Sequence, residues 1–243
     1  MEEFDGCNKR MKPAGTLKGL IFDFNGVLLW DDHIQRDSWR AFASQLCRRS
    51  LTDDEIDIHI HGRSGQYTLE YLLGEPIDAP KIAALMEQKE LLYREMCLNL
   101  DGDFKLSPGS HELLDDLVKY KIPITIATAS IKKNVDFFVE HLDLDRWFDV
   151  KKIVFDDGVS PGKPGPDPYI SAASQLNLAP QACVAIEDSR SGIQAAQAAG
   201  VGWLVALGPL AAHQTLAKLP GVDQVITHLG QVAIQDWFER LLL

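Results

Sequence analysis

Short, continuous apolar runs recur along this chain, and they constrain its fold more than any other feature of the sequence. Each run has the length of one β-strand, and most of them end at a polar residue or a glycine. Strands without apolar–polar alternation are typical of a parallel sheet that is covered on both faces. The six runs are residues 18–22, 122–127, 153–155, 183–186, 203–207 and 224–226.

Helix-like segments lie between the later runs, so that βαβ alternation is the most economical interpretation. The last of these segments is rich in alanine, which suits a helix that packs closely against a sheet. The sequence therefore predicts an α/β fold with a Rossmann-like parallel sheet. The expected helices are residues 110–119, 133–141, 169–176 and 192–199.

The pattern changes between the first and second apolar runs, where amphipathic segments follow one another without a convincing strand. These segments are residues 37–47, 53–60, 66–73 and 81–99. The breaker cluster Ser107-Pro108-Gly109 closes the region before the next helix. We therefore expect a core of residues 17–30 and 106–243, an inserted all-helical cap of residues 31–105, and a flexible tail of residues 1–16.

The charge balance of the chain limits its partners. The sequence has 24 Lys and Arg against 35 Asp and Glu, a formal charge of −11, and no run of basic residues. Nucleic acids and anionic membrane surfaces are poor partners for such a chain, which favours a small molecule instead.

The cysteines and apolar segments bear on localisation. The four cysteines are scattered without CxxC spacing, which indicates free thiols in a reducing compartment. No apolar run approaches the about 20 residues of a membrane helix, and residues 1–16 lack the apolar segment of a signal peptide. We expect a cytoplasmic protein, either a monomer or a small homo-oligomer.

Polar residues follow three of the expected strands. Asp23, Thr128 and the pair Glu187-Asp188 each stand where an apolar run ends. Because ligands of doubly wound sheets bind at the carboxyl ends of the strands, these side chains are expected to meet in one crevice.

Asp23 begins the segment Asp23-Phe24-Asn25-Gly26-Val27 directly after the first run. Gly26 permits a tight turn beside a carboxylate, and a carboxylate at the rim of a sheet can serve as a nucleophile and as a metal ligand. Taken alone, an Asp followed by a Gly after a strand is equally well explained as a turn.

Three further segments add to the expected crevice. The hydroxyl and successive amides of Thr128-Ala129-Ser130 can bind phosphoryl oxygens, although capping is the usual role of such residues. Lys163 lies in a proline-stiffened loop that can hold one ammonium near a phosphate, although most loop lysines are simply solvated. Glu187 and Asp188 supply the hard oxygen ligands that Mg²⁺ prefers, unless they cap a helix.

Four segments, in their order along the chain, resemble the haloacid dehalogenase superfamily, and the resemblance covers about residues 18–207. They are DFNGV, the strand end at Thr128, KPGPDPY and IEDSRSGIQAAQAAG. The particular likeness is to that superfamily's beta-phosphoglucomutase-like phosphatase branch with a helical cap. The resemblance implies that Asp23 forms an aspartyl phosphate and that Thr128 and Lys163 hold the transferring phosphoryl group.

The same resemblance implies a Mg²⁺ site and a substrate loop. Asp23, Glu187, Asp188 and the main-chain carbonyl of Asn25 correspond to the metal ligands. The segment His61-Gly62-Arg63-Ser64 resembles the substrate-specificity loop of this branch, in which Arg63 pairs with a phosphate or carboxylate. An exposed loop arginine is the competing explanation for Arg63.

The sequence departs from its relatives at Asn25, where family phosphatases and mutases carry a second Asp as the general acid and base. An amide cannot donate a proton to an alkoxide, and such help is typically worth about 10² to 10⁴ in rate. Three explanations stay open. The leaving group needs no proton, a cap residue such as Asp31, Asp32 or His33 replaces the acid, or catalysis has been lost.

We therefore expect a magnesium-dependent phosphatase that acts on a small phosphorylated metabolite, with Asn25 in place of the usual general acid. Two alternatives are a beta-phosphoglucomutase-like phosphotransferase and a catalytically impaired phosphate-binding regulatory protein. Mutase chemistry ranks lower because Asn25 removes the acid and Gln35 stands where relatives often have His. Metal-free dehalogenation has no evident use for the pair Glu187-Asp188.

Overall fold

The computed structural model describes residues 16–60, 63, 65–100 and 102–238. The chain divides into two compact units, with boundaries after Trp30 and after Lys105. We call Asp31–Lys105 the helical unit and the remainder the sheet unit. The expected tail lies almost wholly outside the described residues.

The sheet unit contains one six-stranded sheet in which every strand pair is parallel. The strand order is β3-β2-β1-β4-β5-β6, so the chain runs outward on one side of β1 and then crosses to the other. The predicted Rossmann-like parallel sheet is thereby confirmed. The strands are β1 (Gly19–Phe22), β2 (Ile124–Ile131), β3 (Val154–Asp156), β4 (Cys183–Glu187), β5 (Trp203–Leu207) and β6 (Gln224–Ile226).

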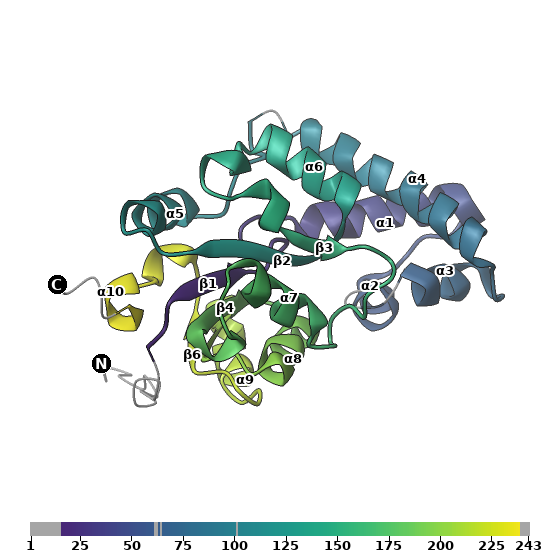
Figure 1. Cartoon of the computed structure of the whole chain (residues 1–243). Coiled ribbons are helices and arrows are strands. Elements are labelled where there is room, and N and C mark those ends of the chain that lie inside the picture. The colour runs from purple at the N-terminus through teal and green to yellow at the C-terminus, as the bar shows by residue number, and fades with distance from the viewer. Residues whose placement is uncertain (1–15, 61–62, 64, 101, 239–243) are drawn as a thin grey trace, which may run out of the picture. The chain divides into compact units, whose positions relative to one another are not determined.

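Helices cover both faces of this sheet (Figure 1). In Figure 1, α5 and α6 lie on one face, and α7 and α8 lie on the other. Along the chain, α7 lies between β3 and β4, and α8 lies between β4 and β5. The helices of the unit are α5 (Ser110–Lys119), α6 (Lys132–His141), α7 (Asp167–Gln175), α8 (Arg190–Ala199), α9 (His213–Leu216) and α10 (Ile234–Trp237).

The core of the sheet unit lies around the central strands, as continuous apolar runs require. Every residue of β1 and β4 is buried. On α8, Ala195 and Ala196 have no exposed surface, and their small side chains bring the helix close to the sheet. This packing makes the ends of β1 and β4 firm supports for the side chains that follow them.

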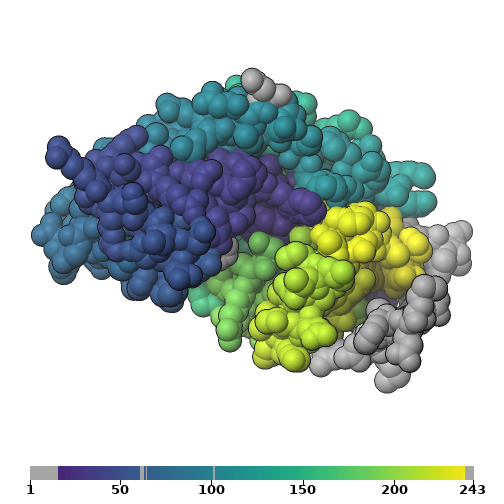
Figure 2. All heavy atoms as spheres, turned by 180° about the vertical axis from the view of Figure 1, so that it is seen from behind, coloured from purple at the N-terminus to yellow at the C-terminus, as the bar shows by residue number. Residues whose placement is uncertain are grey.

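The C-terminal segment after β6 lies beside α5 on the surface of the sheet unit (Figure 1, Figure 2). The approach is close, because a Cβ atom on Gly109 would lie 2.1 Å from the backbone nitrogen of Gly230. Gly109 also has a φ of +82°, a conformation that glycine adopts at little cost.

Among the described helices, none combines the length and apolar character needed to cross a membrane.

The helical unit contains no strand among its described residues. The side chains of Thr52 and Glu55 form a reciprocal capping box at the start of α2, and Asp78 caps α4. Apolar residues such as Phe42 and Leu69 form a separate core. The helices are α1 (Asp32–Cys47), α2 (Asp53–His59), α3 (Gly65–Leu73) and α4 (Ala79–Leu98).

Two boundaries differ from the sequence-based prediction by more than two residues. We expected the second strand to end before Thr128, but β2 continues to Ile131 because it pairs with β3 as far as Asp156. Thr128, Ala129 and Ser130 therefore lie within a strand. The first helix of the insertion begins at Asp32 and not near residue 37.

Candidate active site

Asp23 stands directly after β1 and is held at the edge of the sheet by its own backbone. Its amide donates to the carbonyl of Ile186 in β4 at 3.0 Å. A tight turn follows, in which the carbonyl of Phe24 accepts from Val27, Leu28 and Leu29. The ring of Phe24 stacks on Phe138 of α6 at 4.4 Å and anchors this turn in the core.

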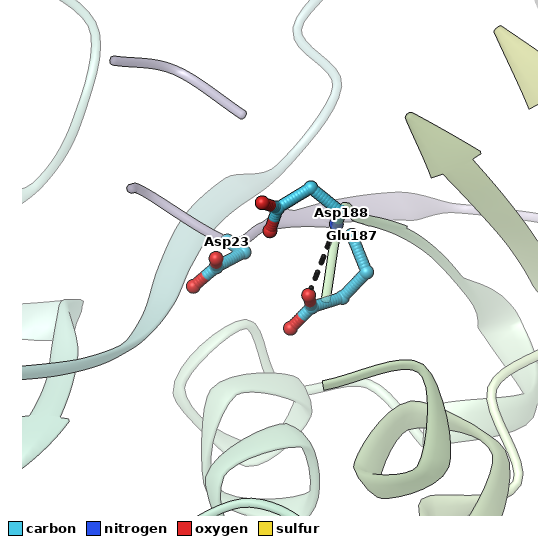
Figure 3. Close-up of side chains that lie close together, drawn as sticks. All are labelled: Asp23, Glu187 and Asp188. Atoms are coloured by element: carbon cyan, nitrogen blue, oxygen red, sulfur yellow. Dashed lines mark hydrogen bonds between the residues drawn. The ribbon is translucent and has the colours of Figure 1, made fainter. Parts of the chain in front are cut away.

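Asp23, Glu187 and Asp188 come together at the ends of β1 and β4 (Figure 3). One carboxylate oxygen from each lies within 4.8 Å of the others, which is a spacing that can hold a metal ion. The sequence predicted this meeting from strand ends alone. Gly26 makes room for it, because a Cβ atom at this position would lie 2.0 Å from Asp188 Oδ2.

Lys163 reaches the acidic cluster from the loop between β3 and α7. Its Nζ donates to Asp23 Oδ1 at 2.7 Å and to Glu187 Oε1 at 2.5 Å. The lysine side chain is only 5% exposed, so Lys163 is a buried residue and not a solvated loop lysine. The structure thus brings Lys163 next to Asp23, and its expected role in holding a phosphoryl group stays a prediction.

Glu187 is the most heavily hydrogen-bonded of the three acids. Besides Lys163, its Oε1 accepts from the hydroxyl of Tyr169 at 2.8 Å. Its Oε2 accepts from the amide of Asp188, drawn as a dashed line in Figure 3, and from the amide and hydroxyl of Ser189. A Cβ atom on Gly192 would lie 1.7 Å from Oε1, so that glycine leaves space for this carboxylate.

Tyr169 is a site residue that the sequence-based reasoning missed. It lies in α7, has no exposed surface, and its ring centre is 5.3 Å from Lys163 Nζ. The sequence signal for this role was the position of Tyr169 six residues after Lys163 in the segment KPGPDPY. A buried tyrosine usually needs a hydrogen-bond partner for its hydroxyl, and a nearby polar site can supply one.

The acids and the lysine alter one another's protonation. Burial raises the pKa of Asp23 to about 7, and the charge of Glu187 adds to this shift while Lys163 opposes it. Burial, followed by the charges of Asp23 and Glu187, also raises the pKa of Asp188 well above its usual value. Burial would lower the pKa of Lys163, but the charges of Asp23 and Glu187 outweigh it and raise this pKa.

β2 contributes hydroxyl groups next to the turn after β1. Thr128 is buried, and its Oγ1 accepts from the backbone amide of Ser130 at 3.1 Å. The hydroxyl of Ser130 donates to Asn25 Oδ1 at 2.7 Å. Ala129, which lies between Thr128 and Ser130 in the sequence, is exposed. The structure therefore links the DFNGV turn to the second predicted segment through a contact that spacing did not reveal.

The candidate site residues of the helical unit contact other residues of that unit. Arg63 is exposed, donates from Nε to the carbonyl of Ile58 at 3.1 Å and covers the ring of Tyr67. Gly62 lies outside the described residues. Asp31 is buried and accepts from Tyr93.

Two other residues suggested as replacement acids are exposed. Asp32 pairs with Arg36 on the surface of the helical unit, at 2.8 Å. His33 is also exposed.

The profile of haloacid dehalogenase-like hydrolases matches residues 17–200 of this chain. A phosphorylated carbohydrates phosphatase of Thermotoga maritima is 30% identical over 186 residues, which cover 76% of this chain and 82% of the relative. Protein CbbY of Rhodobacter capsulatus is 32% identical over 191 residues, or 76% and 83% of the two chains. A beta-phosphoglucomutase of Bacillus subtilis is 29% identical over 191 residues, or 76% and 81%.

Solved structures agree with these matches. An Entamoeba histolytica protein described as a HAD hydrolase, family IA, variant 3, has a TM-score of 0.86 at 31% identity. The match covers 93% of this chain and 100% of that one. A beta-phosphoglucomutase of Clostridium difficile shares the fold, with a TM-score of 0.74 at 23% identity over 93% and 99% of the two chains. This chain is therefore a member of the haloacid dehalogenase-like hydrolase family.

Proposed function

We propose that this chain is a magnesium-dependent phosphatase that acts on a small phosphorylated metabolite through an aspartyl phosphate on Asp23. The observation that carries the proposal is the buried contact of Asp23 with Lys163 beside Glu187 and Asp188. The relatives named as a carbohydrate phosphatase and a phosphoglucomutase support the substrate class.

Asp23 is the proposed nucleophile. Its carboxylate oxygen forms a bond to phosphorus while the bond from phosphorus to the leaving oxygen breaks, and that oxygen keeps the electron pair. Water then attacks phosphorus and loses a proton to the solvent, the bond to Asp23 breaks, and phosphate leaves with the carboxylate restored. Lys163 offsets the negative charge of Asp23 and of the phosphoryl oxygens as they approach each other.

The charges around Asp23 fit a divalent cation. Lys163 pairs with Asp23 and Glu187, and Asp188 lies beside them, so the negative charges of the ionised acids exceed the single ammonium. Burial is the main cause of the raised pKa values of Asp23 and Asp188, and the neighbouring negative charges add to it. We propose that Asp23, Asp188 and the carbonyl of Asn25 hold Mg²⁺, with Glu187 adding charge and a further ligand oxygen. When bound, Mg²⁺ neutralises charge on the phosphoryl oxygens.

Thr128 and Ala129 are proposed to bind the phosphoryl oxygens from the β2 side. Ser130, which was expected to join them, uses its amide on Thr128 and its hydroxyl on Asn25. Because Thr128 Oγ1 already accepts from the amide of Ser130, its own proton is directed to another acceptor. A phosphoryl oxygen is an acceptor of the required kind. Lys163, from the loop before α7, and Thr128, from β2, would then both contact the group.

Asn25 governs which leaving groups depart readily. Its amide cannot donate a proton, so esters whose oxygen needs protonation should react slowly, whereas acyl phosphates and anhydrides leave as stable anions. The phosphotransferase alternative ranks lower for the same reason, since transfer between sugar hydroxyls needs an acid and a base. The intact contacts among Asp23, Lys163 and Glu187 argue against a scaffold that has lost catalysis altogether.

Phosphate release with Mg²⁺, measured across acyl phosphates, sugar phosphates and nucleotides, tests the proposal. The native protein is compared with Asn25→Asp, with Asp23→Asn as the blank and with Asp136→Asn, an exposed acid of α6, as the matched control. Preference for acyl phosphates supports the role of Asn25. Efficient native turnover of sugar phosphates would point to another acid, and release only after Asn25→Asp would favour the impaired protein.

A further inference from the structure

The contact between Asn25 and Ser130 joins two segments that lie 105 residues apart in the sequence. Asn25 belongs to the turn after β1, and Ser130 lies on β2. The serine is well placed to direct another side chain, because its own amide is fixed by Thr128 Oγ1 at 3.1 Å. β2 also pairs with β3 at Ala127 and Ile131, on either side of Ser130 in the sequence.

The carbonyl end of the Asn25 amide faces the serine. The hydroxyl of Ser130 donates to Asn25 Oδ1 at 2.7 Å, a length typical of an O–H···O hydrogen bond. The amide nitrogen of Asn25 therefore occupies the end turned away from Ser130.

We propose that Ser130 is a positioning residue that holds Asn25 so that its amide N–H stabilises the leaving oxygen. This inference rests on the proposed phosphatase function. As the bond to phosphorus breaks, the leaving oxygen keeps the electron pair and gains negative charge. The N–H group hydrogen-bonds to that oxygen without transferring a proton, and the departed anion takes its proton from water.

This role has a signature that a structural role lacks. The value of an N–H donor grows with the charge on the leaving oxygen, so it is greatest for leaving groups of high pKa. Loss of a hydrogen bond of this kind lowers the rate by about tenfold for the poorest leaving group and by much less for the best. A serine that only supported the fold would lower all rates by the same factor.

The test uses a series of aryl phosphates whose phenols differ in pKa, with kcat/KM measured in the presence of Mg²⁺. Ser130→Ala should steepen the dependence on leaving-group pKa, and Ser130→Thr, which keeps the hydroxyl, should restore the native slope. Asn25→Ala should show the same steep slope, and the double variant should be no steeper. Ser160→Ala, which removes a hydroxyl bonded to Asp157 in an exposed loop, serves as the control.

A second measurement does not depend on turnover. The side-chain NH₂ signals of Asn25, identified by their loss in Asn25→Ala, should shift and exchange faster in Ser130→Ala but not in Ser130→Thr. Parallel rate losses across the series, or unchanged NH₂ signals in Ser130→Ala, would overturn the positioning role. If the native protein released no phosphate, the proposed function would fail, and the NH₂ signals would still decide whether Ser130 orients Asn25.

Discussion

Lys163 Nζ lies 2.7 Å from Asp23 Oδ1, so a buried ammonium touches the proposed nucleophile directly. The same nitrogen also contacts Glu187, whose carboxylate has no exposed surface. This lysine thus offsets two charges that would otherwise repel each other inside the sheet unit. Lys163, Asp23 and Glu187 therefore stabilise one another, and the loss of Lys163 would leave the two buried carboxylates without their cationic partner.

Lys163→Met removes the ammonium while keeping most of the side-chain volume. We expect the free energy of unfolding to fall by about 3–5 kcal/mol, because Asp23 and Glu187 are left buried without their partner. Phosphatase activity should be lost at the same time. Urea unfolding and phosphate release measure the two effects.

Lys132→Met is the matched control, because this lysine also pairs with an aspartate but its side chain is 62% exposed. Surface pairs contribute little, so its unfolding free energy should change by less than about 1 kcal/mol. Equal effects of the two substitutions would contradict the buried role of Lys163.

Tyr169→Phe removes one hydroxyl from a fully buried ring. Glu187 Oε1 then loses a hydrogen bond of 2.8 Å, which should lower the free energy of unfolding by about 1–3 kcal/mol. Affinity for Mg²⁺ should weaken as well, since the carboxylate is less firmly oriented. Calorimetric titration with Mg²⁺ measures this change.

Tyr120→Phe provides the comparison for this substitution, since Tyr120 is 43% exposed. Neither unfolding nor Mg²⁺ affinity should respond to it. A Tyr169→Phe variant with native Mg²⁺ affinity would show that the hydroxyl plays no part in orienting Glu187.

Gly26→Ala tests the close approach of the DFNGV turn to Asp188. A Cβ atom would lie 2.0 Å from Asp188 Oδ2, and the φ of +81° adds strain for any other residue. Gly74→Ala separates the two causes, because Gly74 has a φ of +73° but no atom within 4 Å of a Cβ. We expect both variants to lose about 1 kcal/mol from backbone strain, and only Gly26→Ala to lose Mg²⁺ binding.

The pH dependence of stability follows from the raised pKa of Asp23. A carboxyl whose pKa rises from 3.8 to about 7 on folding stabilises the fold fully below pH 3.8. That contribution is lost as the pH rises through about 7. Asp188 acts in the same direction. Because Mg²⁺ binds the ionised carboxylates, its stabilisation of the protein should grow with pH across this window.

Thermal unfolding with and without Mg²⁺ at several pH values checks this expectation. Asp23→Asn is the control, since an amide does not titrate and the dependence on pH should become shallower. Stabilisation by Mg²⁺ that is the same at every pH would show that protons and Mg²⁺ do not compete at this site.

The sequence predicted the parts of the fold that follow from local chemistry. β5, β6 and α5 have the expected bounds because their apolar patterns end at polar residues or Gly. β2 runs beyond the prediction because pairing with β3 compensates for its polar residues, which no local pattern reveals. Likewise, the contact between Ser130 and Asn25 depends on strand register.

The site was predictable to the extent that strand ends converge. Asp23, Glu187 and Asp188 were found in this way, and Lys163 joined them through its motif. Tyr169 was missed because a helical tyrosine is usually part of the core, and only its buried contact with Glu187 distinguishes it.

The most direct test of the central claim is to trap the covalent intermediate. The native protein is quenched in acid during turnover of an acyl phosphate with Mg²⁺, and its peptides are analysed by mass spectrometry. We expect one added phosphoryl group on Asp23, which hydroxylamine removes and which Asp23→Asn lacks. Turnover without any phosphorylated Asp23, or the group on a different residue, would contradict it.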